Sequence, residues 1–207
     1  METTTSIRVW DAPTRVFHWL LVFCFAGAYL TAESERWSLV HVTLGYTLGG
    51  LIAFRLLWGM VGTRYARFSS FVQGPAAVLR YAKSMTVGSP KHFVGHNPAG
   101  AVAIVLLIVA GIAIVATGYA TYNDIGGEWL SEVHEAAANT MLVLVGIHIA
   151  GVVVASWLHK ENLARAMVTG FKQGQAAQGI HRVWVSVAVL LLAAVLAFWY
   201  VQWAAAV

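Results

Sequence analysis

Long apolar runs dominate this chain and restrict what it can fold into. Of its 207 residues, 59% are hydrophobic and 11% are charged, which is far from the balance of a soluble domain. About 20 apolar residues suffice to cross a bilayer as a helix, and in lipid a helix satisfies its own backbone polar groups. Five runs are of roughly this length: residues 16–32, 40–61, 98–122, 133–158 and 183–206. We therefore expect an all-α integral membrane protein.

The first run also has features of a secretory signal, because it is short and follows Arg8 and Arg15. No small-residue cleavage site follows it, and His18 places a polar ring within it, so we expect it to remain as a membrane helix. The single cysteine, Cys24, lies in the same run. One cysteine excludes an internal disulfide, a thiolate zinc cluster and covalent C-x-x-C-H haem attachment. A cofactor would therefore be held without thiolates.

Basic residues gather in alternate connections between the runs. They are Arg8 and Arg15 before the first run, Arg64, Arg67, Arg80, Lys83 and Lys91 after the second, and Lys160, Arg165, Lys172 and Arg182 after the fourth. The other two connections carry Glu33, Glu35 and Arg36, and then Asp124 and Glu128. The positive-inside bias predicts a multi-pass membrane protein with a cytoplasmic N-terminus and a C-terminus on the outer side. The net charge of +4 then reflects topology, and no basic stripe indicates a nucleic-acid partner.

Two histidines of the fourth run, His134 and His148, are 14 residues apart. At about 100° and 1.5 Å per residue, this spacing ends about 40° short of four full turns and about 21 Å further along a helix, so both imidazoles face the same way at two depths. The first and second runs place His18 near the level of His148 and His41 near the level of His134. Ionisable side chains inside a membrane are costly and usually functional. We predict two cross-helix pairs, His18 with His148 near the cytoplasm and His41 with His134 near the outer surface.

Paired imidazoles of this kind can occupy both axial positions of a haem iron, while the porphyrin fills apolar space in a helix bundle. Two non-covalent, bis-histidine b-type haems would transfer electrons across the membrane without readily binding substrate. Gly45 lies four residues after His41, on the same face, where a missing side chain would admit a macrocycle or a neighbouring helix. Arg55 lies 14 residues after His41 and could pair with a propionate of the inner haem or reach the interface as a snorkelling arginine.

The segment 62–97 contains no Asp or Glu and is bounded by Gly and Pro. Within it, residues 78–85 have the spacing of a short amphipathic helix in the headgroup region; a lid over a cofactor or quinone is the alternative. Arg64 and Arg67, with nearby aromatic residues, suit a quinone headgroup or haem propionates, and equally suit lipid phosphates. We expect solvated surface roles for the four remaining histidines, which are His92, His96, His159 and His181.

Four sequence segments together resemble the bacterial di-haem cytochrome b561 family, which includes the cytochrome b subunits of nickel-iron hydrogenases. They are RVWDAPTRVFHW from Arg8, FRLLWGMVGTRYARF from Phe54, GHNPAG from Gly95 and VHE from Val133. The resemblance covers about residues 7–170 and leaves the fifth run, 183–206, outside a four-helix haem-binding core. It implies one haem ligand from each of the first two helices and two from the fourth, which match His18, His41, His134 and His148.

The resemblance also implies the function and the partners. We expect one membrane cytochrome b domain over residues 1–207 that passes electrons between the quinone pool, ubiquinone or menaquinone, and a periplasmic cytochrome c or oxidoreductase subunit. Membrane lipids surround it, and a homo-oligomer is compatible with the sequence. An electron carrier is favoured over a stand-alone enzyme.

Two other functions compete with electron carriage. The first is a quinone-linked oxidoreductase acting on a small oxidant such as superoxide, although the acidic outer connections would repel an anion. The second is a transporter or assembly scaffold, although the sequence lacks paired broken helices and midplane carboxylates.

Overall fold

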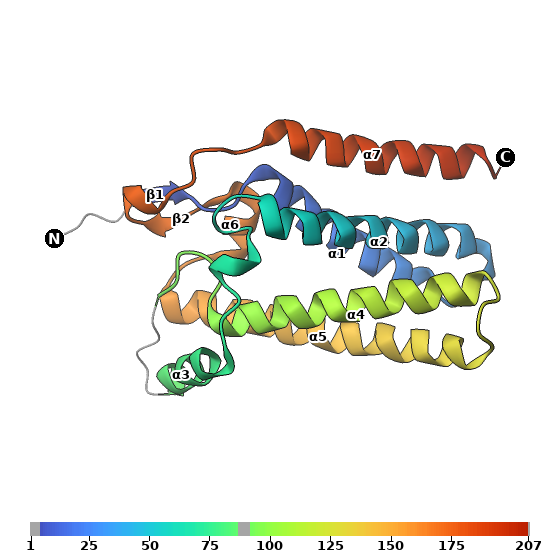
Figure 1. Ribbon diagram of the computed structural model, residues 1–207, viewed down its shortest axis with the longest axis horizontal. Helices are drawn as coiled ribbons and strands as arrows, with labels where there is room; N and C mark the ends of the chain where they lie inside the picture. Colours follow the sequence, from blue (N-terminus) through green and yellow to red (C-terminus); the bar gives the residue numbers. More distant parts are fainter. Residues whose placement is uncertain (1–4, 87–91, 207) are drawn as a thin grey trace. The chain divides into compact units, whose positions relative to one another are not determined.

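The computed structural model describes residues 5–86 and 92–206 (Figure 1). Lys91, one of the basic residues used to predict the orientation, lies outside this part. In chain order the elements are β1 (Thr5–Arg8), α1 (Ala12–Thr31), η1 (Glu35–Trp37), α2 (Ser38–Val61), η2 (Phe68–Ser70), α3 (Pro75–Thr86), α4 (Pro98–Tyr122), α5 (Trp129–His159), α6 (Leu163–Thr169), β2 (Phe171–Gly174), η3 (Ala176–Gln178) and α7 (Val185–Ala204).

Five of these helices, α1, α2, α4, α5 and α7, are long and apolar enough to cross a membrane. Their bounds lie within four residues of the five predicted runs. The predicted all-α membrane fold is therefore confirmed. The continuity of α5 also confirms that His134 and His148 share one helix.

Local sequence signals explain where several helices begin and end. Pro98 is the first residue of α4, a position whose N–H has no partner within the helix, so the lack of an N–H in proline costs nothing there. The Asn97 side chain caps the helix by accepting a hydrogen bond from Gly100 N–H at 2.7 Å. Asn162 caps α6 by accepting from Arg165 N–H at 2.7 Å. Helix α6 ends at Gly170, whose φ of 88° is left-handed and favours glycine.

The amphipathic helix predicted at residues 78–85 is present as α3. Its exposed apolar residue Leu79 is 71% accessible, whereas Tyr81 is buried and packs edge-on against Phe93. An apolar side chain that faces outward suits the headgroup position predicted for this helix, which stays a prediction. Burial raises the pKa of Tyr81 above its usual value of 10.0.

The chain divides into two compact units, each with its own core. Unit 1 comprises residues 1–11, 57–107 and 143–183, and unit 2 comprises residues 12–56, 108–142 and 184–207. In unit 2, α7 packs against α1, and Trp199 of α7 donates to the Thr47 hydroxyl of α2 at 2.8 Å. The buried core of unit 2 consists of Phe17, Cys24, Leu44, Leu48, Leu51, Ile52 and Val195.

Unit 1 contains a two-stranded antiparallel sheet that the sequence did not predict. Strand β1 pairs with β2, with Ile7 opposite Lys172. Each strand has only four residues, too few for the alternation that marks a strand in a sequence. The sheet connects the N-terminal segment to the segment after α6. The buried core of unit 1 consists of Ile7, Val9, Trp10, Tyr65 and Ala166.

Candidate functional site

His41 of α2 and His134 of α5 face each other within unit 2. Their ring centroids are 6.2 Å apart and their planes are inclined at 81°. Both side chains are half-buried, and both helices are long and apolar enough to span a membrane. The structure thus brings together the predicted outer pair.

The Nδ1 atom of each ring is held by a backbone carbonyl on a neighbouring helix. His41 Nδ1 lies 2.8 Å from the Ala28 carbonyl oxygen of α1, and His134 Nδ1 lies 3.0 Å from the Ile114 carbonyl oxygen of α4. Since a carbonyl can only accept, both Nδ1 atoms donate, and a neutral imidazole that donates from Nδ1 has its free lone pair on Nε2. This is how a metal-binding imidazole is usually oriented by its surroundings.

The separation of the two rings fits one metal ion between them. A ligating imidazole nitrogen lies about 2 Å from its metal and about 1 Å from its own ring centre, so two opposed ligands have ring centres about 6 Å apart. The measured 6.2 Å agrees with this separation. Two neutral nitrogen donors without a thiolate or carboxylate are the donor set of a six-coordinate haem iron.

The glycines near the pair differ in the space around them. A Cβ added at Gly45 would meet no atom within 4 Å, so the space beside this turn of α2 is open, and its use by a macrocycle stays a prediction. A Cβ at Gly118 of α4 would lie 2.8 Å from His134 Cε1, so the His134 ring packs directly on α4 backbone. The space beside Gly49 of α2 is not open, because the Val115 side chain of α4 occupies it.

The predicted inner pair is divided between the two units. His18 lies in α1 of unit 2, next to the Trp19 ring, and His148 lies in α5 of unit 1. Both are half-buried. Ligation of a second haem by His18 and His148 stays a prediction.

The three predicted arginines differ in exposure. Arg55 is buried, with 4% of its surface accessible, which is unlike a snorkelling arginine and fits a charged group that serves a buried anion. Arg64 and Arg67 are exposed, and the Arg64 guanidinium lies 5.4 Å from the centre of the Tyr65 ring. Their roles toward propionates or a quinone stay predictions.

The remaining histidines lie in unit 1, and not all of them are solvated. His92 and His181 are exposed, as expected. His96 is half-buried between the rings of Trp10 and Phe71, each 4.6 Å away, because flanking Gly95 lets the loop pack closely on Tyr65. The expectation of a solvated role was therefore wrong for His96.

Several polar partners in the structure were missed by sequence reasoning. Thr117 of α4 places its hydroxyl oxygen 3.2 Å from His134 Nδ1. Asp11 is fully buried and accepts hydrogen bonds from Trp58 Nε1 at 3.1 Å and the Thr63 hydroxyl at 2.6 Å. An aspartate next to a membrane helix was a usable signal, since such groups are rare there, whereas carbonyl partners carry no sequence signal.

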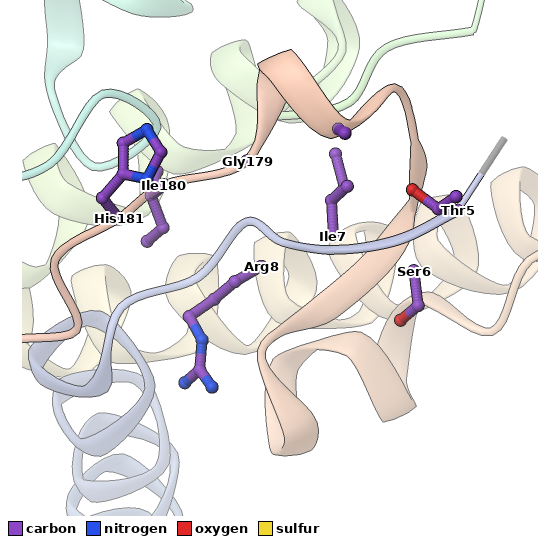
Figure 2. A pocket seen from close by; sticks show the side chains of 8 residues that line it. Thr5, Ser6, Ile7, Arg8, Gly179, Ile180 and His181 are labelled. Carbon is purple, nitrogen blue, oxygen red and sulfur yellow. The ribbon is translucent and has the colours of Figure 1, made fainter. Parts of the chain in front are cut away.

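A cavity of about 260 Å³ lies beside β1 in unit 1. Figure 2 shows that the side chains of Ser6 and Arg8 point to one side of the strand and Ile7 to the other. The Arg8 guanidinium lies 4.6 Å from the centre of the Phe171 ring. The residues lining this cavity include none of the predicted ligands: Thr5, Ser6, Ile7, Arg8, Ala176, Gly179, Ile180 and His181.

Apolar helices long enough to span a membrane, with an imidazole pair between two of them, are the arrangement expected of an integral-membrane cytochrome of the b type. A sequence model described as prokaryotic cytochrome b561 matches residues 9–170. The chain therefore belongs to the prokaryotic cytochrome b561 family, and α7 lies beyond the matched region.

Curated relatives carry names that agree with this family. The chain is 26% identical over 149 residues to the probable Ni/Fe-hydrogenase 1 B-type cytochrome subunit of Escherichia coli (strain K12), covering 59% of this chain and 63% of that protein. It thus spans less than two thirds of that relative. The probable Ni/Fe-hydrogenase B-type cytochrome subunit of Rhizobium leguminosarum bv. viciae is 24% identical, covering 80% and 88% of the two chains. That of Rhodobacter capsulatus is 22% identical, covering 81% and 82%. No solved structure matches the chain.

Proposed function

We propose that this protein is a transmembrane di-haem electron carrier that links the quinone pool to a periplasmic redox partner. The observation that carries the proposal is the His41–His134 pair, with ring centres 6.2 Å apart and both Nδ1 atoms bound to carbonyls. Bound haem would supply a one-electron redox centre. His41 and His134 would hold the outer haem, and His18 and His148 the inner one.

The proposed orientation places the N-terminus in the cytoplasm and the C-terminus in the periplasm, in the bacterial cytoplasmic membrane. The connections after α2 and α5 carry most of the lysines and arginines, which supports this orientation. Residues 1–207 would act as one membrane domain, with the haem-binding core at about 7–170.

The charge at the outer end of unit 2 supports a basic redox partner. The connections after α1 and α4 and the first turns of α5 hold six exposed carboxylates and a single arginine, Arg36: the acids are Glu33, Glu35, Asp124, Glu128, Glu132 and Glu135. This acidic end lies in the same unit as the His41–His134 pair. A negative surface next to a redox centre attracts a positively charged protein and speeds the encounter. A basic cytochrome c or oxidoreductase subunit fits this charge.

The quinone would exchange electrons with the inner haem near the exposed Arg64 and Arg67. Cationic and aromatic groups lie together there, as in the contact between Arg64 and Tyr65. Arg55, buried in α2, would pair with a propionate of the inner haem.

The test is the haem content of purified ligand variants. We expect two b-type haems per chain in the wild-type protein, and one each in His134→Gln and His148→Gln, seen as loss of part of the reduced α band. His159→Gln, an α5 histidine outside the proposed pairs, is the matched control and should keep both haems. A wild-type protein with fewer than two haems, or His134→Gln with two, would contradict the proposal.

A further inference from the structure

Thr117, on the α4 turn that faces His134, contributes a second acceptor to that histidine. Its hydroxyl donates to the Ala113 carbonyl oxygen at 2.7 Å, and the same oxygen lies 3.2 Å from His134 Nδ1. Since the hydroxyl proton is already used on the Ala113 carbonyl oxygen, with the Ile114 carbonyl oxygen as a longer second acceptor at 3.2 Å, a lone pair of Oγ1 can accept the Nδ1–H of His134. That N–H is therefore shared between Thr117 Oγ1 and the Ile114 carbonyl oxygen, 3.0 Å away.

The two facing imidazoles are thus held differently. Within the described residues, the His41 ring contacts the Ala28 carbonyl oxygen at 2.8 Å, whereas His134 contacts both a carbonyl and a hydroxyl oxygen. The ring of His134 is also fixed on its α4 side, since a Cβ at Gly118 would come within 2.8 Å of Cε1. Thr117 and Gly118 together determine the rotation of this ring about its side-chain axis.

We propose that Thr117 is a positioning residue for the outer haem, fixing the Nδ1–H tautomer and the plane of His134 and lowering the reduction potential of the iron it binds. This inference rests on the proposed function. A hydrogen-bond acceptor for Nδ1–H makes Nε2 a stronger electron-pair donor to the iron, and a stronger electron-pair donor favours the ferric state. The orientation of His134 also sets the 81° angle between the two rings, so the ferric electron paramagnetic resonance (EPR) signal of a bound haem would report a change in that orientation.

The experiment is a redox titration of the holoprotein and its variants, followed optically and by EPR. In Thr117→Val, which keeps the shape and removes the hydroxyl, we expect one of the two midpoint potentials to rise. A threefold change in the ratio of reduced to oxidised outer haem corresponds to about 30 mV, at about 59 mV per tenfold for one electron. The EPR signal of the same haem should shift, and the other haem should be unchanged.

Matched variants separate positioning from packing. Thr117→Ser keeps the acceptor and should restore the wild-type potential. Thr140→Val removes a hydroxyl that makes the same bond to the residue four positions earlier, Ala136, at an exposed site of α5, and should change neither potential. If Thr117→Val does not accumulate, Thr117→Cys, with its weaker sulfur acceptor, should show a smaller rise.

Unchanged potentials and EPR signals in Thr117→Val, or in Thr117→Cys where that variant is used, would overturn the inference. A rise that persists in Thr117→Ser would also overturn it, because the hydroxyl would then be irrelevant. Both results leave the haem count intact, so the proposed function would stand. A wild-type protein without two haems would instead remove the function itself.

Discussion

Gly118 is the position at which a single methyl group should affect the outer site most. An added Cβ would lie 2.8 Å from His134 Cε1 and 3.1 Å from Nδ1, and both close contacts are to the ring that has to stay in place. We expect Gly118→Ala to rotate or displace this ring and to cost the outer haem, measured as a fall from two haems per chain to one. Gly50→Ala is the control, because a Cβ there meets nothing within 4 Å. Full haem content in Gly118→Ala would mean that the ring adapts.

Gly45 should respond to side-chain size rather than to any substitution. Its Cβ position is open, so Gly45→Ala should be tolerated, whereas Gly45→Phe should fill the space proposed for the macrocycle. The expected result is normal haem content in the first variant and loss of the outer haem in the second, read from the reduced-minus-oxidised spectrum. Equal haem content in both would show that the porphyrin lies elsewhere.

The sequence supports the histidine positions better than the hydrogen bonds that orient them. The 14-residue spacing places His134 and His148 on one face because an α-helix has a fixed pitch. The partners of the rings, such as the Ala28 and Ile114 carbonyls, are backbone atoms that every residue type has. Only the packing of α1 and α4 brings these atoms to the histidines, so they could not be found from residue identity.

At the scale of elements, Trp199 connects α7 to the helix that carries His41. Its indole N–H donates to Thr47 at 2.8 Å, and its ring lies 5.7 Å from that of Phe23. Trp199→Phe keeps the aromatic ring and removes the donor, so we expect a loss of about 1 kcal/mol of stability with unchanged haem content. Trp203→Phe, at a position that is 64% exposed, is the control in thermal melts. Equal melting temperatures for the two variants would contradict a role for this hydrogen bond.

A buried ion pair joins β2 to the segment that precedes α6. Lys172 Nζ lies 3.2 Å from Glu161 Oε2 and donates to the Phe93 carbonyl oxygen at 3.1 Å, and the His92 ring is 3.5 Å from the same carboxylate. Burial lowers the pKa of Lys172 below its usual 10.5, and the Glu161 carboxylate partly offsets this. Glu161→Gln should cost about 3 kcal/mol, because it leaves a buried ammonium without its counter-charge.

The pH dependence of this variant has a definite sign. Because the folded pKa of Lys172 lies below 10.5, the unfolded chain binds more protons in the interval between the two values, and stability rises with pH there. Glu161→Gln lowers the folded pKa further, so its melting temperature should rise more steeply than that of the wild type as pH rises toward 10.5. Glu161→Gln combined with Lys172→Met should remove the extra slope. A slope that remains in the double variant would assign it to another group.

The membrane helices could be predicted because one pattern in the sequence determines them. The two strands could not be predicted, because they form only by pairing with each other. The membrane helices follow from uninterrupted apolar length, as α4 illustrates by matching its predicted run, residues 98–122, at both ends. The β1–β2 pair depends on contacts between residues far apart in the chain, such as Ile7 with Lys172. Such a register is set by tertiary packing, which four-residue segments do not encode.

At the scale of the whole molecule, charge is distributed very unevenly along the chain. The protein has a net charge of +4, yet six of its nine acidic residues lie in the connections after α1 and α4 and in the first turns of α5. This uneven distribution of charged residues gives the acidic end of unit 2 a negative surface. The proposed orientation rests on the same distribution. The same charge distribution thus supports both the orientation of the protein in the membrane and the attraction of a basic partner.

This asymmetry should control the rate of electron exchange with a basic partner. We expect the second-order rate constant for reduction of a basic c-type cytochrome, measured by stopped flow, to fall as ionic strength rises, because screening acts over about 10 Å at 0.1 M salt. Glu128→Gln with Glu132→Gln should lower the rate at low salt and flatten its salt dependence. Arg80→Gln, at an exposed position of α3 in unit 1, is the control with a charge change remote in sequence from the acidic end. Equal rates and equal salt slopes for all three proteins would exclude the acidic end as the docking surface and leave the haem assignments untouched, since those depend on the imidazoles alone.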